Sequence, residues 1–411
     1  MRHIINKILL SMVIMSGLVL TACRDHNDEP ELLGPALPEG VGQMVLIYAV
    51  NHNNLSGDLK KNERDMLEAM KVYDVDKCKL LVYKYTASNP GLYEVASNGA
   101  DREFRLIKEY DKSMLSVTAE RVSQVIEDAV SFYPDFNKDL FFWGHGSGWV
   151  NPNKYSPTKV VTGAGSKRVT PQSFGGEYAG DTDYTSVYIN IDELAAAVPD
   201  NVFDILWFDC CYMSSIEVAY QFRNKCNIYV GYPTEIMADG LPYAKVLPTV
   251  FSRNPKAGAD ELYKYYTEKS SPEPVTVAVM DMGKIEDVAD VAKGIYALGE
   301  NRPSVVGLQD YSRYRNAPYY DFGQYMRSYI NMNVSEEDAG FKDSKMVELQ
   351  NALNDFVIYK KASEVDFNYP TGNPILPENY SGLSTHNYLG LNTEREVFYR
   401  KLDWFHATRG N

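Results

Sequence analysis

The chain has 411 residues and a formal net charge of −14, and its 45% hydrophobic and 23% charged residues are ordinary for a globular protein with a large core. The acidic balance argues against a general nucleic-acid-binding protein, which needs a positive surface to meet phosphates. Five cysteines are too few for a disulfide framework at this length, and their spacing predicts no zinc or other metal site.

The first residues indicate an export signal. Arg2 and Lys7 precede an almost wholly apolar run over residues 8–20, which is shorter than a membrane span requires. The run leads into Leu-Thr-Ala-Cys, which resembles the lipobox of bacterial lipoproteins. This resemblance implies that residues 1–22 are removed, that Cys23 carries a lipid, and that the exported protein is anchored to the cell envelope, at the outer membrane or cell surface. An uncleaved anchor helix is the alternative.

Residues 23–42 are acidic and rich in proline and glycine, which predicts a flexible tether. The chain beyond them alternates between apolar runs typical of buried strands and stretches with helical character. We predict strands over residues 44–50, 78–85, 140–143, 203–208, 228–232 and 275–280, and a hairpin over residues 92–96 and 103–109. We predict helices over residues 56–72, 118–132, 190–198, 214–224, 242–251, 260–268, 284–298 and 343–359.

Strands that alternate with helices predict an α/β fold, in which a mainly parallel sheet is covered by helices on both faces. We expect this sheet to form one domain over residues 43–300. Residues 301–411 are less regular and include the aromatic run 399–405, and we interpret them as an extension packed on that domain. Residues 150–188 are polar and lack periodicity, which indicates a functional or disordered loop.

Two reactive side chains follow predicted strands, at the edge where open α/β sheets bind ligands. His145 follows strand 140–143 with a glycine on either side, which exposes the ring and lets the backbone approach a ligand. Cys211 follows strand 203–208 and precedes a helix predicted to begin at Ser214, whose positive end favours the nucleophilic thiolate. Taken singly, each residue also fits a role without chemistry, as a turn histidine or a buried structural cysteine.

The two motifs together indicate catalysis. A right-handed crossover between parallel strands places their ends side by side or nearly so, and the imidazole and the sulfur then face one cleft. A peptidase needs a thiolate, a base that protonates the leaving amine, and donors for the tetrahedral oxyanion. Cys211 and His145 supply the first two, and the backbone N–H groups of Gly146 and Cys211 are natural oxyanion donors. An α/β-hydrolase is excluded, because the sequence lacks the Gly-x-Ser-x-Gly elbow.

The order of the two motifs is similar to that of the caspase-like cysteine peptidases, and the clostripain family is the nearest resemblance. Four segments carry it: a cysteine block over residues 209–220, a histidine block over residues 144–149, residues 53–55, and residues 240–243.

Three positions differ from the family: Cys210, His52 and Leu241 stand where it has Ala, Asp and Trp. Because successive side chains of an extended segment point in opposite directions, only one of the adjacent sulfurs faces the cleft. The family spacing assigns that role to Cys211.

The resemblance implies a Cys211–His145 dyad that cleaves proteins or peptides after Arg or Lys. Asp209 would then lie near the floor of the pocket for the basic side chain. A second acid would come from the loop after the next strand, where Asp239 is the first choice and Glu235 the second. The physical need is a carboxylate, because a buried guanidinium must be paired. The alternative is that Asp209 caps or orients the turn between strand and helix.

Members of the resembled family are often self-cleaving and calcium-dependent. The polar stretch 150–188 holds Lys154, Lys159, Lys167 and Arg168, and cleavage at Lys167 or Arg168 would open the space between the two motifs. The chemistry requires no cofactor. Calcium is compatible with the resemblance, although the sequence has no EF-hand-like run.

Two other functions are open at this point. The chain could be a surface-anchored binding protein that keeps a caspase-like fold without turnover, or a transferase or ligase that uses the same dyad. The presence of both the cysteine and the histidine favours the peptidase.

Overall fold

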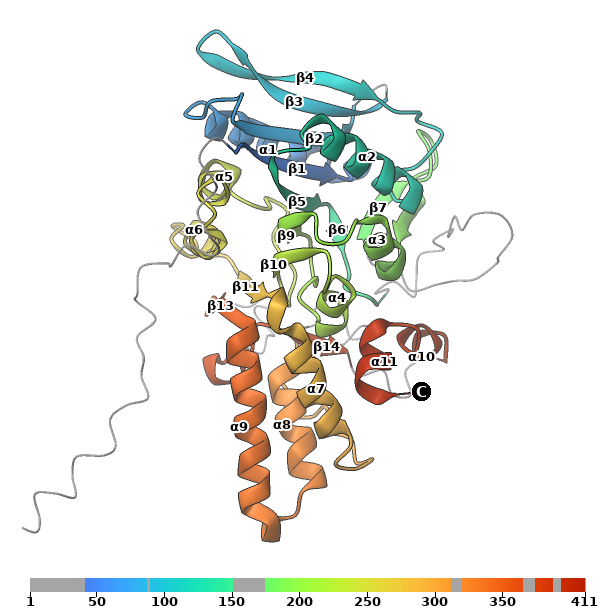
Figure 1. Cartoon of the computed structure of the whole chain (residues 1–411), viewed down its shortest axis with the longest axis vertical. Helices are drawn as coiled ribbons and strands as arrows, with labels where there is room; N and C mark the ends of the chain where they lie inside the picture. The colour runs from blue at the N-terminus through green and yellow to red at the C-terminus, as the bar shows by residue number, and fades with distance from the viewer. Residues whose placement is uncertain are drawn as a thin grey trace, which may run out of the picture.

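The computed structural model describes residues 41–86, 89–150, 174–311, 319–364, 374–386 and 393–410. A nine-stranded sheet runs through its centre (Figure 1). From edge to edge its strands are β13 (Val357–Ala362), β11 (Thr276–Asp281), β10 (Cys226–Gly231), β9 (Phe203–Asp209), β5 (Asn137–Trp143), β1 (Gln43–Ala49), β2 (Cys78–Tyr85), β3 (Pro90–Asn98) and β4 (Asp101–Glu109).

The five inner strands, β10, β9, β5, β1 and β2, run parallel to one another. At one edge β11 and β13 pair antiparallel, and at the other edge the hairpin of β3 and β4 does the same. The predicted α/β fold with a mainly parallel sheet is therefore confirmed, with antiparallel strands confined to the edges.

Helices cover both faces of this sheet. The buried side chains of β1 explain the arrangement: Val45 and Ile47 belong to one core, whereas Met44 and Leu46 belong to the other. Strands buried on both faces are continuous apolar runs, which is why the sequence revealed them. One core includes α1 (Ser56–Met70), α5 (Tyr243–Phe251) and α6 (Pro255–Thr267), and the other includes α2 (Ala119–Phe132), α3 (Ile191–Ala197), α4 (Ile216–Gln221) and α7 (Ile285–Tyr296).

The C-terminal part of the chain contributes to the main sheet. The helices α8 (Phe322–Asn333) and α9 (Ala339–Phe356) lie beside α7, and β13 follows α9 directly to form an edge strand (Figure 1). The predicted helix 343–359 is therefore wrong at its end. Its last residues are β-branched or aromatic, and Val357 and Tyr359 pair with β11. The chain ends in α10 (Thr393–Tyr399) and α11 (Asp403–Arg409), and α11 packs on α4 and α7.

Two small sheets lie near the ends of the inner strands. One joins β6 (His145–Gly146), β7 (Phe174–Tyr178) and β8 (Ser186–Ile189), and the other joins β12 (Tyr319–Asp321) and β14 (Ser384–His386). The strands β7 and β8 contradict the prediction of a loop without regular structure over this part of residues 150–188.

Several predictions fall outside the described residues. These are the export signal over residues 1–22, most of the tether, the lipidation site Cys23, and the self-cleavage positions Lys167 and Arg168. Among the residues that the structure does describe, no helix combines the length and the apolar character needed to cross a membrane.

Candidate active site

The histidine and cysteine motifs meet because their strands are neighbours. In the parallel pair of β5 and β9, Trp143 lies opposite Asp209, so the carboxyl ends of the two strands are level and the two motifs follow them side by side. Beyond the strands, a Cβ built on Gly146 would lie 2.5 Å from the Cys211 carbonyl oxygen and 3.1 Å from the Cys211 nitrogen. The backbones of the two loops are therefore in direct contact, and only glycine fits at position 146. The predicted convergence at one edge is found.

The adjacent sulfurs have different surroundings. The Cys210 side chain is fully buried, and its thiol donates to the carbonyl oxygen of Phe142 at 3.2 Å. Cys211 is partly exposed as a residue, and its Sγ accepts a hydrogen bond from the Ile236 N–H at 3.4 Å. Of the two adjacent cysteines, Cys211 is therefore the more exposed residue.

The imidazole of His145 is oriented by an asparagine from the loop after β1. His145 Nε2 lies 2.9 Å from Asn54 Oδ1. Because an amide oxygen only accepts, this bond selects the tautomer protonated at Nε2 and leaves Nδ1 free to act as a base. The neighbouring Asn53 shapes the same turn by accepting from the Leu55 N–H at 2.9 Å. The sequence pointed to residues 53–55 by resemblance, but no role for Asn54 could be assigned without its partner 91 positions away.

Burial favours the neutral forms of both the Cys211 thiol and the His145 imidazole. Burial, and then the negative charge of Glu235, raises the pKa of the Cys211 thiol, whereas burial lowers the pKa of His145. Among the described residues, no hydrogen bond joins these two side chains. The helix predicted to begin at Ser214 begins at Ile216, with Ser215 as its cap, so its positive end lies further along the chain from Cys211 than the sequence predicted.

Asp209 is a buried carboxylate with an incomplete set of partners. It is 4% exposed, and its Oδ2 accepts from the Leu241 N–H at 3.2 Å and from the Tyr243 hydroxyl at 3.0 Å. Its Oδ1 has no hydrogen-bond partner among the described residues. Burial raises the pKa of Asp209 to about 7, although these two hydrogen bonds oppose the shift. The partners lie beyond β10 rather than in the turn before α4, so Asp209 does not cap that helix.

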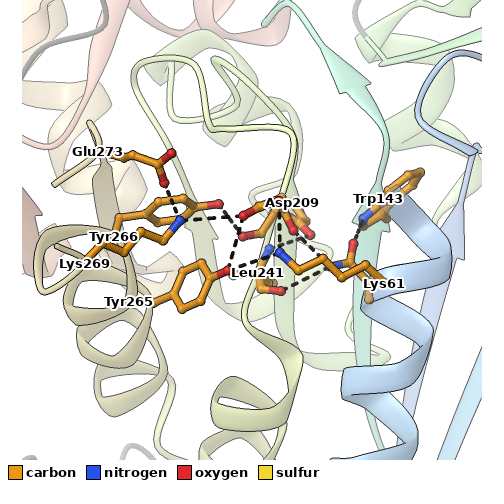
Figure 2. A network of polar contacts seen from close by, with 11 residues as sticks. Lys61, Trp143, Asp209, Leu241, Tyr265, Tyr266, Lys269 and Glu273 are labelled. Carbon is orange, nitrogen blue, oxygen red and sulfur yellow. Dashed lines mark hydrogen bonds and ion pairs between the residues drawn. The ribbon is translucent and has the colours of Figure 1, made fainter. Parts of the chain in front are cut away.

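Asp239 already has two cationic partners, Lys61 and Lys269, both of which are labelled in Figure 2. Its carboxylate lies 2.9 Å from Lys61 Nζ and 3.6 Å from Lys269 Nζ, and the Tyr265 hydroxyl donates to it at 3.3 Å. Burial acts to raise the pKa of Asp239, but the hydrogen bond from Lys61 and the charges of both lysines outweigh it, so the pKa is lowered. By contrast, Glu235 is close enough to Cys211 for its charge to act on the thiol.

Metal binding has little support in the described part of the chain. Within it, no group of three or more His, Cys, Asp or Glu side chains is placed to hold an ion. Calcium dependence stays a prediction, and no chemical step is assigned to a metal.

The fold and the site define a class of protein: the cysteine peptidases whose histidine and cysteine follow adjacent parallel strands of a mainly parallel sheet. The model of the clostripain family matches residues 47–407, which is most of the chain. The chain therefore belongs to the clostripain family and is a cysteine peptidase of that family.

Solved structures show the same fold. A secreted C11 cysteine protease from Bacteroides thetaiotaomicron, in complex with an irreversible peptide inhibitor, is 24% identical with a TM-score of 0.72, and the match covers 90% of this chain and 100% of that one. An inactive zymogen C11 protease from Parabacteroides distasonis is also 24% identical with a TM-score of 0.70, and the match covers 91% and 99% of the two chains. No significant match is found among curated proteins.

Proposed function

We propose that this peptidase is an endopeptidase that cleaves after Arg or Lys with a Cys211–His145 dyad. The observation that carries the proposal is the contact of Gly146 with the Cys211 backbone, which joins the two motifs at one sheet edge. The accessibility of Cys211, in contrast to the buried Cys210, supports the choice of nucleophile.

In the proposed mechanism, Nδ1 of His145 accepts the Cys211 proton as the sulfur attacks the carbonyl carbon of the scissile bond. The negative charge on the carbonyl oxygen is stabilised by the N–H groups of Gly146 and Cys211. His145 then gives the proton to the leaving amine, and a water molecule hydrolyses the thioester. Asn54 keeps the imidazole in the required tautomer throughout, as the third member of such sites commonly does.

Two carboxylates are proposed to recognise the basic side chain. Asp209 offers a buried oxygen without a partner among the described residues, and a guanidinium or ammonium would complete its hydrogen bonds. For the second acid, we propose Glu235 ahead of Asp239, which was the first choice from sequence. Lys61 and Lys269 already compensate the charge of Asp239, whereas the charge of Glu235 acts on the catalytic thiol.

The proposed cellular location is the cell envelope, at the outer membrane or cell surface, with a lipid on Cys23. The export pattern over residues 1–22 supports this, and the similar Bacteroides thetaiotaomicron protease is described as secreted. Labelling of the intact protein with an alkyne fatty acid tests it: Cys23→Ala should abolish the label, and a retained label would refute lipidation there.

Self-cleavage and calcium dependence are proposed on the family resemblance alone. N-terminal sequencing of active protein should reveal a new end after Lys167 or Arg168, and an intact active chain would refute the cleavage. Activity measured with and without EGTA tests the need for calcium.

The decisive experiment uses fluorogenic peptides with Arg or Lys before the scissile bond. Cys211→Ala and His145→Ala should abolish cleavage, whereas Cys210→Ala should keep most of it because that thiol is buried and faces the Phe142 carbonyl. The reverse pattern for the two cysteines would overturn the assignment. A folded parent protein without turnover would instead favour the binding-protein alternative, and products with an added amine would indicate a transferase.

A further inference from the structure

Tyr319, from the C-terminal part of the chain, contacts both the loop after β5 that contains His145 (the histidine loop) and the loop after β9 that contains Cys211 (the cysteine loop). Tyr319 is 1% exposed, and its hydroxyl donates to the Ser147 carbonyl oxygen at 2.6 Å. The same hydroxyl accepts from the Val150 N–H at 3.3 Å. The two bonds close the turn that follows His145, across 172 positions of sequence.

The ring of Tyr319 also packs against the cysteine loop. It stacks on Tyr212, the residue after Cys211, with a centroid distance of 5.1 Å and an interplanar angle of 17°. Tyr212 has a φ of +61°, which a residue other than glycine rarely adopts. Its N–H donates to the Thr234 carbonyl oxygen at 2.8 Å, so both the stack and this bond hold the unfavourable conformation.

The frame that carries Tyr319 is fixed to the cysteine loop as well. In the small sheet of β12 and β14, Tyr319 lies opposite His386. β14 is attached to the segment after Cys211: the Ser384 N–H donates to the Ser214 carbonyl oxygen at 3.0 Å, and the Thr385 hydroxyl donates to Glu217 at 2.6 Å. The strand pair that carries Tyr319 is therefore attached to the cysteine loop, while the Tyr319 hydroxyl binds the histidine loop.

The space around the hydroxyl is filled on the side of the histidine loop. Gly148 has a φ of +62°, and a Cβ on it would collide with the Tyr319 hydroxyl. The tyrosine thus lies directly against the backbone of the turn, with no room for a side chain between them. A displacement of Tyr319 would move this turn relative to Cys211.

We propose that Tyr319 is a positioning residue that sets the separation of the His145 and Cys211 loops. The inference rests on the proposed dyad. A proton passes between two side chains only at hydrogen-bond distance, so a small change in the separation of the loops lowers the rate of the chemical step more than substrate affinity.

The test is Tyr319→Phe, which removes the hydroxyl and keeps the ring stack. Tyr329→Phe is the matched control, because Tyr329 is also 1% exposed and its hydroxyl also donates to a backbone carbonyl at 2.6 Å, that of Gly299, away from the site. Both variants should lose similar thermal stability. Only Tyr319→Phe should lower kcat, by about tenfold with little change in KM.

Equal kcat in the two variants would overturn the inference while leaving the dyad intact. Inactivity of the parent protein would instead refute the proposed function. The rate at which iodoacetamide alkylates Cys211, located by mass spectrometry, then still tests the positioning. This rate should be lower in Tyr319→Phe than in Tyr329→Phe, and equal rates would refute the role of Tyr319.

Discussion

Replacement of Asp209 by Asn should weaken the recognition of Arg and Lys side chains but stabilise the folded protein above pH 7, so the two roles of the carboxylate can be separated. The amide is nearly isosteric with the carboxylate, and its oxygen can still accept from the Leu241 N–H and the Tyr243 hydroxyl. What the variant loses is the negative charge. If Asp209 binds the basic side chain, the lost charge-assisted hydrogen bond is worth about 1.5–3 kcal/mol, or about 10- to 150-fold in kcat/KM.

The effect on stability follows from the raised pKa. The folded protein holds the Asp209 proton up to about pH 7, whereas the carboxyl ordinarily titrates near 3.8. The folded state therefore binds the proton more tightly, and stability falls as pH rises from about 4 to about 7. The difference amounts to about 4 kcal/mol above pH 7. Asp209→Asn removes this loss but buries an amide N–H group without a partner, at a cost of about 1–3 kcal/mol. A net gain of about 1–3 kcal/mol is expected at pH 8, and a net loss at pH 4.

Two assays check these expectations. Urea unfolding of parent and variant at pH 4 and pH 8 measures the stability change. Cleavage of matched peptides with Arg, Lys or Gln before the scissile bond measures recognition. In the parent, kcat/KM for Arg relative to Gln should rise with pH through about 7 as Asp209 ionises. If the variant lost activity equally on all three peptides, charge recognition by Asp209 would be refuted. If the gain in stability of the variant over the parent were no larger at pH 8 than at pH 4, the raised pKa of Asp209 would be refuted.

Three further substitutions test the site. Gly146→Ala should abolish activity and destabilise the fold, because its Cβ would lie 2.5 Å from a backbone carbonyl oxygen. Gly57→Ala is the control, because a Cβ at that position would have nothing within 4 Å. A thermal melt and the peptide assay should show no change for this control. Asn54→Ala should lower kcat by about 10- to 100-fold and shift the pH–rate profile, because His145 loses its orienting acceptor; an unchanged profile would refute the role. Asp239→Asn should change kcat/KM for Arg peptides by less than about threefold, because lysines already compensate that charge; a larger loss would restore Asp239 as the second acid.

The fold could be predicted where burial of an element is visible in its own sequence as a pattern of apolar residues. Every residue of β1 is buried, so the strand is a continuous apolar run that no exposed element would show. β7 could not be predicted, because its sequence Phe-Gly-Gly-Glu-Tyr has neither alternation nor an apolar run. Both of its glycines have positive φ, and the strand exists because it pairs with the short strand that contains His145.

The site could be predicted only in part, for a related reason. The cysteine and histidine carry their chemistry in the sequence, and parallel strand order brings them together. The partners of these residues come from distant segments: Asn54 and Tyr319 are 91 and 172 positions from the residues they bind. Likewise, no local pattern shows that Lys61 compensates Asp239, since that contact depends on how α1 packs against the loop after β10.

The electrostatics of the resting site explain why such distant contacts matter. Burial disfavours the charged form of both Cys211 and His145, and so acts against a preformed thiolate–imidazolium pair. In the proposed dyad, the proton would then pass to His145 as the substrate is attacked, and its transfer would depend on the distance and angle between the two groups. Catalysis at such a site would depend more on the relative positions of the thiol and the imidazole than on a permanently lowered thiol pKa. Under the proposed mechanism, residues that fix the two loops and the imidazole should therefore control the rate of the chemical step.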